Sequence, residues 1–446
     1  MLSLRFHRGT LEIEGDTSFI EGAVVDPWSA TARAPASALA SIANACAIRG
    51  VELRGAPMWP LRQTSIEGLS LRPYQEAALH AWKEADSRGI VVLPTGAGKT
   101  RVAFAALGDT GLPAAVLCPT RALASQWVTE LQGWLGEEVG LIGDGVNELR
   151  RVTVLTFESA YRHMDRLGAR FGLLVVDEAH HLGGALRREA LEACAATARL
   201  GLTATLAGTS AAQEDLLGPL VYEQTLASLV GRHLAPLRIV REHIALDPEE
   251  AAAYTRLITP FRTAARRVFQ DHGDVDFGTL SRLLGSSTEG RRALRDRSKA
   301  DALVSFPSGK RVRVRSLIEA YRNTKTLIFT AYGAEAYTIA SDCLVPVITA
   351  ETSPRERSDI LRRFREGPLR AIVSARVLNE GIDVPDASVA IVVSGTLGQR
   401  EHVQRVGRVL RPGEGKVALV HELVTRGTSD ARRARKRALD ALRAIS

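Results

Sequence analysis

The sequence contains little cysteine: a chain of 446 residues has only Cys46, Cys118, Cys194 and Cys343. These lie far apart and form no Cys-x-x-Cys pair, so neither a zinc ribbon nor a disulfide framework is indicated, and a reducing cytoplasm is the simplest expected location. No apolar run approaches the roughly 18 residues that a membrane span needs, so no membrane partner is expected. Residues 1–16 have no continuous apolar core and no small-residue cleavage site, so no secretory signal is expected.

The charge balance is basic, with a formal net charge of +8 and a pI near 9.6. This favours a polyanionic partner only weakly, because many basic proteins bind no nucleic acid. A chain of this length is expected to form two or three domains.

Residues 1–64 read as a small α+β unit. Apolar and polar residues alternate on both sides of Arg8-Gly9, which predicts a β-hairpin. A helix is predicted to start at Pro35 and to end just before Gly50. The stretch 54–65 is rich in Pro and Gly and is typical of a linker.

From about residue 65, short apolar runs alternate with helical stretches, and each run ends in polar or small residues. This rhythm indicates βα units around buried parallel sheets. Two such domains are expected, at 65–232 and 233–446. The apolar runs that predict strands are 90–94, 114–119, 152–157, 173–180 and 200–205 in the first domain, and 326–331, 345–350, 371–375, 389–395 and 416–423 in the second.

Residues 250–298, within the second domain, carry no strand signal and predict several helices. They are rich in arginine and are interleaved with Tyr254, Phe261, Phe269 and Phe277. Two interpretations stay open: a helical bundle with an aromatic core and solvated arginines, or a basic insert that grips a phosphate backbone.

The stretch Leu93–Thr100 reads LPTGAGKT and lies between an apolar strand and a helical stretch, as a phosphate-binding loop requires. Gly96 and Gly98 let the backbone turn its N–H groups toward phosphates, and the helix N-terminus adds its dipole. Lys99 is expected to bridge the β- and γ-phosphates, and the Thr100 hydroxyl to hold Mg²⁺. The general GxxxxGK[ST] pattern would place glycine at Leu93. The predicted phosphate-contacting residues are Pro94, Thr95, Gly96, Ala97, Gly98, Lys99 and Thr100.

A pair of carboxylates, Asp177 and Glu178, ends the apolar run LLVVDEAH. Asp177 is expected to coordinate the Mg²⁺ held by Thr100, and Glu178 to orient and activate the attacking water. The alternative, two exposed carboxylates that open a helix, is disfavoured by the phosphate-binding loop ahead of them in the same domain.

PTGAGKT, DEAH and LTAT in this order resemble the first motor domain of superfamily 2 helicases, whose loop tolerates a residue other than glycine at Leu93. The resemblance implies two RecA-like domains, of which the second supplies arginine fingers. Arg408 and Arg411 match those fingers. Arg405 is expected to organise the interface, and Gln404 and Arg405 are expected to take part in coupling. Two guanidinium groups there would neutralise charge on the transferring phosphoryl group.

Further positions follow from the same resemblance. Gln75 in RPYQ is expected to read the adenine edge, which favours ATP over GTP, with Arg72 on the same helical face. In the second domain, Gly381 and Asp383 match nucleotide-facing positions. The residues predicted to contact nucleic acid are Thr120, Arg121 and Thr156, and those predicted to couple the DEAH segment to it are Thr203 and Thr205.

Over nearly its whole length the chain resembles the XPB family in its short archaeal and bacterial form. FHRGTLEIEGD resembles that family's small damage-recognition domain, and residues 348–395 resemble its second motor domain. The insert at 250–298 lies where the family has a thumb-like helical module that contacts DNA. The resemblance implies an ATP-dependent DNA helicase or translocase that moves 3′ to 5′ on duplex or forked DNA in nucleotide excision repair or transcription. It also implies a separate nuclease partner and a monomeric or heterodimeric state.

One element departs from the family. Its Arg-Glu-Asp motif corresponds here to Gln213-Glu214-Asp215, which loses the arginine and is displaced. The sequence therefore leaves open whether the chain separates strands or only translocates along duplex DNA. The rival interpretations are an RNA helicase, a restriction-type duplex translocase and an ATP-gated DNA clamp that seldom hydrolyses. The basic residues 431–446 predict an amphipathic helix that is either solvated or in contact with DNA or a partner.

Overall fold

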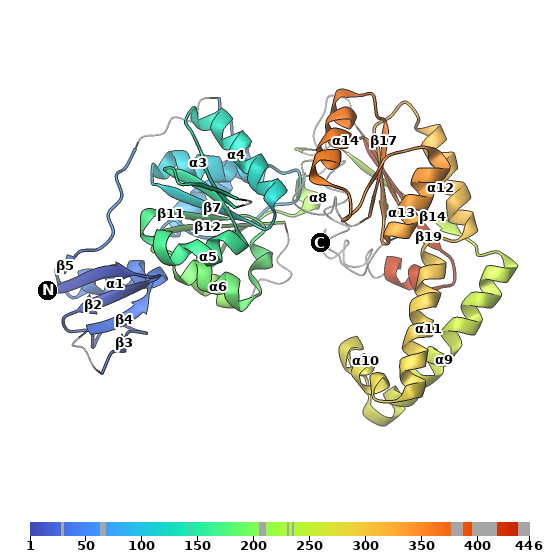
Figure 1. The fold of residues 1–446 in the computed structure, drawn as a ribbon, viewed down its shortest axis with the longest axis horizontal. Helices are drawn as coiled ribbons and strands as arrows, with labels where there is room; N and C mark the ends of the chain where they lie inside the picture. Colours follow the sequence, from blue (N-terminus) through green and yellow to red (C-terminus); the bar gives the residue numbers. More distant parts are fainter. Residues whose placement is uncertain are drawn as a thin grey trace. The chain divides into compact units, whose positions relative to one another are not determined.

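The computed structural model describes residues 1–27, 31–62, 68–143, 145–204, 211–229, 232–233, 236–375, 387–394 and 417–435. The chain forms two compact units (Figure 1), one built chiefly of Met1–Leu226 and the other of the residues that follow. Within the part of the chain that the structure describes, no helix is both long enough and apolar enough to cross a membrane.

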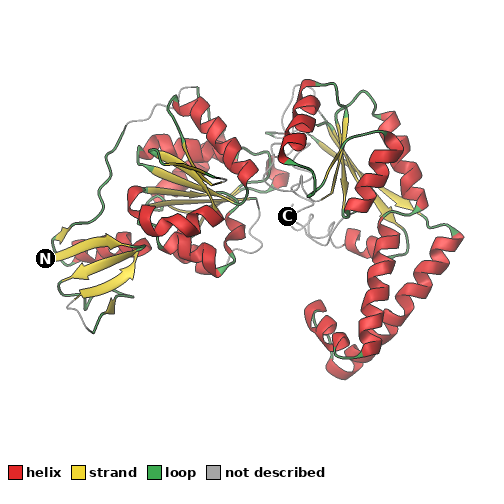
Figure 2. Ribbon diagram, in the orientation of Figure 1, coloured by secondary structure: helices red, strands yellow, loops and turns green. Residues whose placement is uncertain are grey.

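The N-terminal part of the first unit is a five-stranded sheet with strand order β3-β4-β2-β1-β5 and one helix against it (Figure 2). The predicted hairpin is confirmed: β1 and β2 pair antiparallel around Arg8 and Gly9, which both have positive φ values, 48° and 79°, as a two-residue type I′ turn requires. The elements are β1 (Leu2–His7), β2 (Thr10–Glu14), β3 (Val24–Val25), β4 (Thr31–Pro35), α1 (Leu39–Ile48) and β5 (Leu53–Arg54).

The predicted start of the helix at Pro35 was wrong. Pro35 is the last residue of β4 and lies opposite Thr10, and a 3₁₀ turn over Ala36–Ala38 precedes α1. The alanine-rich segment gave no strand signal because alanine has a low β-propensity. Burial of Ala32 and Ala34 between strand and helix explains why small residues stand there.

The stretch after this sheet is held against the first α/β domain over its described part. The Trp59 indole N–H donates to the Ala169 carbonyl at 2.9 Å, and the backbone N–H of Arg62 donates to Gly111. At the turn of the hairpin, a Cβ at Gly9 would lie 2.8 Å from the Ala193 Cβ, so only glycine permits this close approach.

The first α/β domain is an eight-stranded sheet in the order β13-β6-β12-β11-β7-β10-β8-β9, and all neighbours are parallel except β8 and β9. All five predicted strands are present, and the short β8, β9 and β13 are additions that the apolar pattern did not indicate. The strands are β6 (Arg88–Val92), β7 (Ala114–Cys118), β8 (Gly140–Gly143), β9 (Val146–Glu148), β10 (Val152–Thr156), β11 (Leu173–Val176), β12 (Ala198–Thr203) and β13 (Leu220–Glu223). The helices are α2 (Pro73–Glu84), α3 (Lys99–Thr110), α4 (Arg121–Leu135), α5 (Phe157–Leu167), α6 (Ala185–Glu192) and α7 (Ala211–Leu217), followed by the short α8 (Leu226–Leu229).

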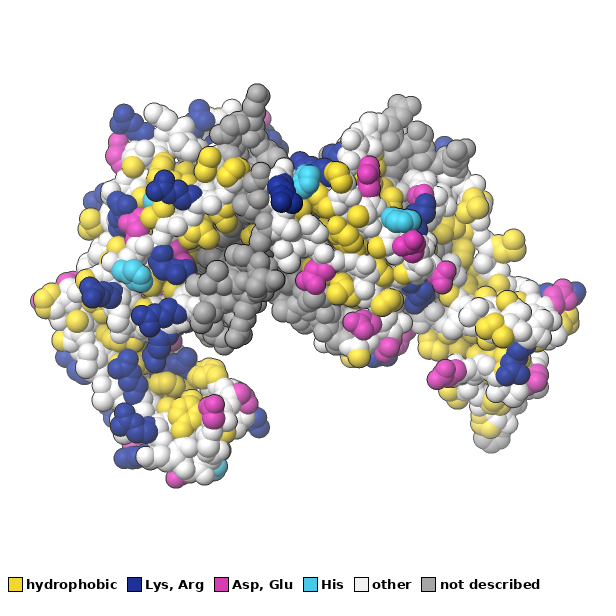
Figure 3. All heavy atoms as spheres, turned by 180° about the vertical axis from the view of Figure 1, so that it is seen from behind, with side chains coloured by type: hydrophobic (Ala, Val, Ile, Leu, Met, Phe, Trp, Pro, Cys, Tyr) yellow, Lys and Arg dark blue, Asp and Glu magenta, His cyan; other side chains and the backbone are white. Residues whose placement is uncertain are grey.

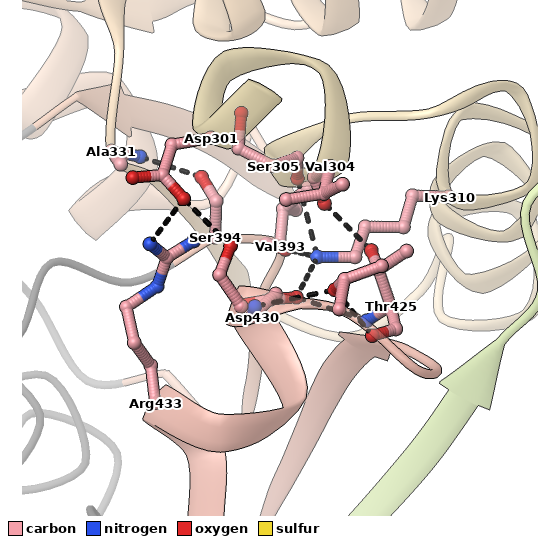
Figure 4. A network of polar contacts seen from close by, with 12 residues as sticks. Asp301, Val304, Ser305, Lys310, Ala331, Val393, Ser394, Thr425, Asp430 and Arg433 are labelled. Atoms are coloured by element: carbon pink, nitrogen blue, oxygen red, sulfur yellow. Dashed lines mark hydrogen bonds and ion pairs between the residues drawn. The ribbon is translucent and has the colours of Figure 1, made fainter. Parts of the chain in front are cut away.

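The second α/β domain is a fully parallel six-stranded sheet in the order β14-β19-β18-β15-β17-β16. Its elements are β14 (Leu237–Ile244), α12 (Ser308–Ala320), β15 (Thr326–Thr330), α13 (Gly333–Cys343), β16 (Val347–Ile348), α14 (Pro354–Glu366), β17 (Ala371–Ala375), β18 (Val389–Val392) and β19 (Ala418–Thr425). A buried polar network around Lys310 joins α12 to the ends of β18 and β19 (Figure 4).

The insert is helical, as predicted, and comprises α9 (Pro248–His272), α10 (Phe277–Gly285) and α11 (Thr288–Ser305). Its aromatic residues divide between core and surface: Tyr254 is buried, whereas Phe269 and Phe277 are 40% and 50% exposed. A partly aromatic core is therefore present, and contact of the insert with a phosphate backbone stays a prediction. Figure 3 shows dark blue arginine and lysine side chains gathered on this module.

Candidate active site and nucleic-acid groove

The phosphate-binding loop has the backbone that its glycines predict. It connects β6 to α3, and Gly96 and Gly98 have φ values of 85° and 78°, where other residues are strained. Lys99 is the first residue of α3, and its ammonium lies 3.5 Å from the Leu93 carbonyl, so the side chain folds back over the loop. The Ala97 N–H is already bonded to the Pro94 carbonyl and is used within the loop.

Gln75 braces this loop. It is 1% exposed, and its amide N–H₂ donates to the Ala97 carbonyl at 2.7 Å and to the Gly98 carbonyl at 3.3 Å. Its amide oxygen accepts the Arg72 backbone N–H, which closes a capping box at the start of α2. Arg72 is the extended N-cap residue and not part of the helix, so its predicted place on the helical face of Gln75 was wrong.

This brace predicts an effect on nucleotide binding. Gln75→Ala should raise the KM for ATP about tenfold, because the loop loses two bonds that hold its shape and ~1.4 kcal/mol corresponds to each factor of ten. If Gln75 also reads adenine, the KM for GTP will rise less than that for ATP; equal rises would leave only the brace. ATPase and GTPase assays measure both. Gln126→Ala, which removes a part-buried hydrogen bond to Glu130 on α4, away from the phosphate-binding loop in sequence, is the matched control.

Asp177 follows β11 and is almost fully buried. The Trp127 indole N–H donates to its Oδ2 and the Glu178 backbone N–H to its Oδ1, both at 2.9 Å. Burial, and next the neighbouring Glu178 carboxylate, raise the pKa of Asp177 to about 6, while the Lys99 ammonium acts in the opposite direction. A cation bound beside this buried carboxylate would stabilise its charged form.

Glu178 has the left-handed backbone conformation, with φ 49°, which is uncommon for a residue with a side chain. Its carboxylate is 14% exposed and lies 3.4 Å from His180 Nδ1. The same nitrogen lies 3.0 Å from the hydroxyl of Thr203, at the end of β12. The DEAH segment is therefore linked to the predicted coupling segment through His180.

The residues at this sheet edge fit a Mg²⁺-bound nucleoside triphosphate. The Thr95 hydroxyl and Glu178 Oε2 are buried and make no hydrogen bond within the described residues, although Glu178 Oε2 lies 3.4 Å from His180 Nδ1 as an ion-pair contact. The site therefore holds polar atoms that a ligand would satisfy. Lys99 supplies a cation for phosphates, and Asp177 and Thr100 supply the oxygen ligands that Mg²⁺ prefers.

The three residues predicted to contact nucleic acid lie together. Thr120 is the N-cap of α4 and Thr156 the N-cap of α5, and both accept a backbone N–H of their own helix. With Arg121 they line a hollow of about 430 Å³, which we call the track groove. Two helix N-termini and a cation converge there, an arrangement suited to phosphate. Its full lining is Pro119, Thr120, Arg121, Thr156, Phe157, Glu158, Tyr161, Leu186 and Arg187.

Seven predicted site residues lie outside the residues that the structure describes: Thr205, Gly381, Asp383, Gln404, Arg405, Arg408 and Arg411. Their roles stay predictions.

The displaced Gln213-Glu214-Asp215 triplet lies on α7. Glu214 and Asp215 are exposed, whereas Gln213 is 3% exposed and its amide donates to the Ala179 carbonyl at 3.2 Å. The first member of the triplet thus packs against the DEAH turn. Sequence reasoning also gave no role to Trp127, His180 or Arg187, although all three contact the site; only His180, inside the DEAH motif, carried a signal.

Two family models match the chain, one described as "Type III restriction enzyme, res subunit" over 68–208 and one as "Helicase conserved C-terminal domain" over 309–413. The chain is also similar in fold to the Hef helicase domain of Pyrococcus furiosus, with a TM-score of 0.54 and 18% identity over 84% of this chain and 99% of that one.

Curated relatives extend beyond the motor motifs. The chain is 37% identical to the DNA 3′-5′ translocase XPB2 of Sulfurisphaera tokodaii, with 85% of this chain and 86% of that protein covered. It is 29% identical to the DNA 3′-5′ helicase XPB of Mycobacterium tuberculosis and 32% identical to the Rad25 protein, a putative DNA 3′-5′ helicase, of Halobacterium salinarum. The chain spans 62% and 56% of the lengths of these two proteins and 82% and 83% of its own length is covered. With two RecA-like α/β domains and this similarity over most of its length, the chain belongs to the XPB family of superfamily 2 helicases.

Proposed function

We propose that this chain is an ATP- and Mg²⁺-dependent DNA motor that couples hydrolysis to movement along, or opening of, duplex DNA in repair or transcription. The observation that carries the proposal is the link from Glu178 through His180 to Thr203, on the same sheet as the track groove. The relatives named as 3′-5′ translocases and helicases support the direction 3′ to 5′.

In this proposal each residue of the ATP site has one task. Lys99 binds the β- and γ-phosphates, and Thr100 and Asp177 hold Mg²⁺, which neutralises phosphate charge when bound. Glu178 orients the attacking water and accepts its proton, from a position fixed by its left-handed backbone. Arg408 and Arg411 from the second domain stabilise charge on the transferring phosphoryl group. Gly381 and Asp383 face the nucleotide, and Gln404 and Arg405 take part in coupling.

DNA contact is proposed at two places. The first is the track groove, with Thr120, Arg121 and Thr156. The second is the helical insert, where Arg297 lies over the rings of Phe261 and Phe277, at 4.7 Å and 4.1 Å from their centroids. The Arg297 side chain is 22% exposed and also lies 3.8 Å from the Asp301 carboxylate, and its contacts with the two rings limit its movement.

The test measures ATP hydrolysis alone and then with duplex DNA, single-stranded DNA and RNA, beside Lys99→Ala. Strong stimulation by DNA and little by RNA, abolished in the variant, is the expected result. Stimulation by RNA equal to that by DNA would replace this proposal with an RNA helicase, and no turnover with any nucleic acid would favour the ATP-gated clamp.

Unwinding and translocation are separated by a second assay. Because Gln213 packs against the DEAH turn and leaves only Glu214 and Asp215 exposed, we propose translocation on duplex DNA as the main activity. Displacement of a triplex-forming strand without separation of a forked duplex is expected. The name of one matching family model raises a duplex translocase of restriction type as an alternative. Such an enzyme would displace the triplex-forming strand as well, but damaged or forked DNA would not stimulate its ATPase.

The proposal also includes a division of the motor at residues 65–232 and 233–446, a separate nuclease partner, and a monomeric or heterodimeric state. A cytoplasmic location is supported by four free cysteines, Cys46, Cys118, Cys194 and Cys343.

A further inference from the structure

Arg187 lies between the track groove and the DEAH turn. It belongs to α6 and lines the groove beside Thr120 and Thr156. Its Nη1 donates to the backbone carbonyl of His181, and its guanidinium lies over the ring of Phe157, 5.4 Å from the centroid. No motif of the sequence analysis includes this residue.

One of the two groups that Arg187 contacts lines the track groove, and the other belongs to the turn after the catalytic carboxylate. Phe157 is the first residue of α5, directly follows the N-cap Thr156 and lines the track groove. His181 lies in the 3₁₀ turn Ala179–Leu182 that begins immediately after Glu178. A displacement of this guanidinium therefore bears on the turn that holds the catalytic carboxylate.

The chemistry of the side chain suits both contacts at once. A guanidinium carries five N–H donors in a planar fork, so its bond to the His181 carbonyl does not exhaust its capacity. The same fork matches two oxygens of a phosphate. A lysine at this position would keep the charge but could not hold both acceptors in one plane.

We propose that Arg187 binds a backbone phosphate of DNA in the track groove and, through the His181 carbonyl, transmits occupancy of the groove to Glu178. This rests on the proposed function, since it requires DNA to occupy the groove. Arg187 is then a coupling residue that positions Glu178 without touching ATP. To the extent that an occupied groove also changes the affinity for nucleotide, linkage requires nucleotide to change the affinity for DNA by the same factor.

Arg188 provides a matched control. It follows Arg187 on the same helix and has the same charge, but its Nε donates to Glu192 at 2.7 Å and it borders a different hollow. Its side chain is 47% exposed. Arg188→Ala should therefore leave DNA affinity and DNA stimulation unchanged.

The experiment compares the full-length chain with Arg187→Ala, Arg187→Lys and Arg188→Ala. Two quantities are measured: the ratio of the ATPase rate at saturating duplex DNA to the rate without DNA, and the affinity for labelled duplex with and without a non-hydrolysable ATP analogue. In Arg187→Ala we expect the rate ratio to fall about tenfold or more. The log–log dependence of DNA affinity on salt should become shallower by about 0.9, because one phosphate contact is lost. The factor by which the ATP analogue changes DNA affinity should fall close to one. Arg187→Lys should keep the salt slope and lose the ratio.

Four outcomes would overturn the inference. A full rate ratio at saturating DNA would make Arg187 a phosphate contact without coupling. Equal falls in both rates, with the ratio preserved, would give it a structural role alone. Loss of the ratio in Arg188→Ala would point to general damage to α6. If DNA does not stimulate the wild-type ATPase, the proposed function itself is contradicted, and this inference with it. If DNA stimulates the wild type and Arg187→Ala keeps the same rate ratio, only the inference is contradicted.

Discussion

Glu178→Gln is expected to lower the rate of ATP hydrolysis by about 10³-fold or more while nucleotide binding is kept. Gln has the shape of Glu but cannot accept the proton of the attacking water, and a positioned general base is worth ~10²–10⁴ in rate. The site makes the loss larger than at a surface: the carboxylate is 14% exposed and its left-handed backbone fixes where it points. The neighbouring Asp177 carboxylate is not free to substitute, because it is held by Trp127 and by the Glu178 backbone.

The measurement is single-turnover hydrolysis at saturating ATP with saturating DNA, beside equilibrium binding of a fluorescent nucleotide. Glu189→Gln, at an exposed position on α6, removes the same charge from the same domain without approaching the loop and should keep the full rate. Residual activity of Glu178→Gln above a tenth of the wild-type rate would show that another group activates the water. A parallel loss of nucleotide binding would show that Glu178 shapes the site rather than serving as the base.

The phosphate loop and the DEAH segment could be predicted because their chemistry is local. Gly96, Gly98, Lys99 and Thr100 are adjacent in sequence, and the loop geometry follows from the conformational freedom of two glycines. The parallel sheets were equally readable, since strands that are buried on both faces appear as continuous apolar runs.

The supports of the site could not be predicted, because each comes from a distant part of the chain. Trp127 reaches Asp177 across 50 positions, and Gln75 reaches Ala97 across 22. A glutamine amide that could read adenine and one that braces a loop have the same sequence signal. Arg187 resembles any arginine on an amphipathic helix until its contact with the His181 carbonyl is seen.

A buried arginine also explains why the predicted start of one strand was too late. Strand β12 begins at Ala198, two residues before the predicted apolar run, because Arg199 interrupts the pattern although it is fully buried. Its guanidinium donates to the carbonyls of Leu191, Cys194 and Leu216. Burial lowers the pKa of Arg199 to about 10, so the group stays charged at neutral pH. In a sequence, an arginine beside an apolar run indicates that the buried strand has ended. Only the structure shows that backbone carbonyls accept its hydrogen bonds, so that it can be buried within the strand.

A second buried cation carries the other large prediction. Lys310 of α12 is 0% exposed, and its ammonium donates to Asp430 Oδ2 at 2.8 Å, to the Val393 carbonyl at 2.7 Å and to the Ser305 carbonyl at 3.2 Å. Three donors meet three acceptors, so the charge is fully satisfied (Figure 4). The three bonds of Lys310 connect α12 to the end of the helical insert, to the residue after β18 and to the segment after β19. The stretch that contains Arg408 and Arg411 follows β18 in the sequence.

Lys310→Met is therefore expected to destabilise the second unit by roughly 3–5 kcal/mol, because it leaves the buried Asp430 carboxylate without its cation. Addition of Asp430→Asn should restore a substantial part of this loss. The double variant removes both the Lys310 and the Asp430 charge, and the Asn side-chain oxygen can still accept the Thr425 N–H that Asp430 accepts at 2.9 Å. Lys299→Met, which removes a 69% exposed lysine from α11, should change stability little.

Urea unfolding can assign the effect to one unit of the full-length chain. All five tryptophans, Trp28, Trp59, Trp82, Trp127 and Trp134, precede the second unit, so tryptophan fluorescence follows the first unit alone, whereas circular dichroism follows both. In Lys310→Met the dichroism transition should begin about 1 M urea earlier while the fluorescence midpoint stays in place. A shift of both midpoints together would show that the two units unfold as one, and a double variant no more stable than Lys310→Met would show that lost packing, and not an unpaired carboxylate, sets the cost.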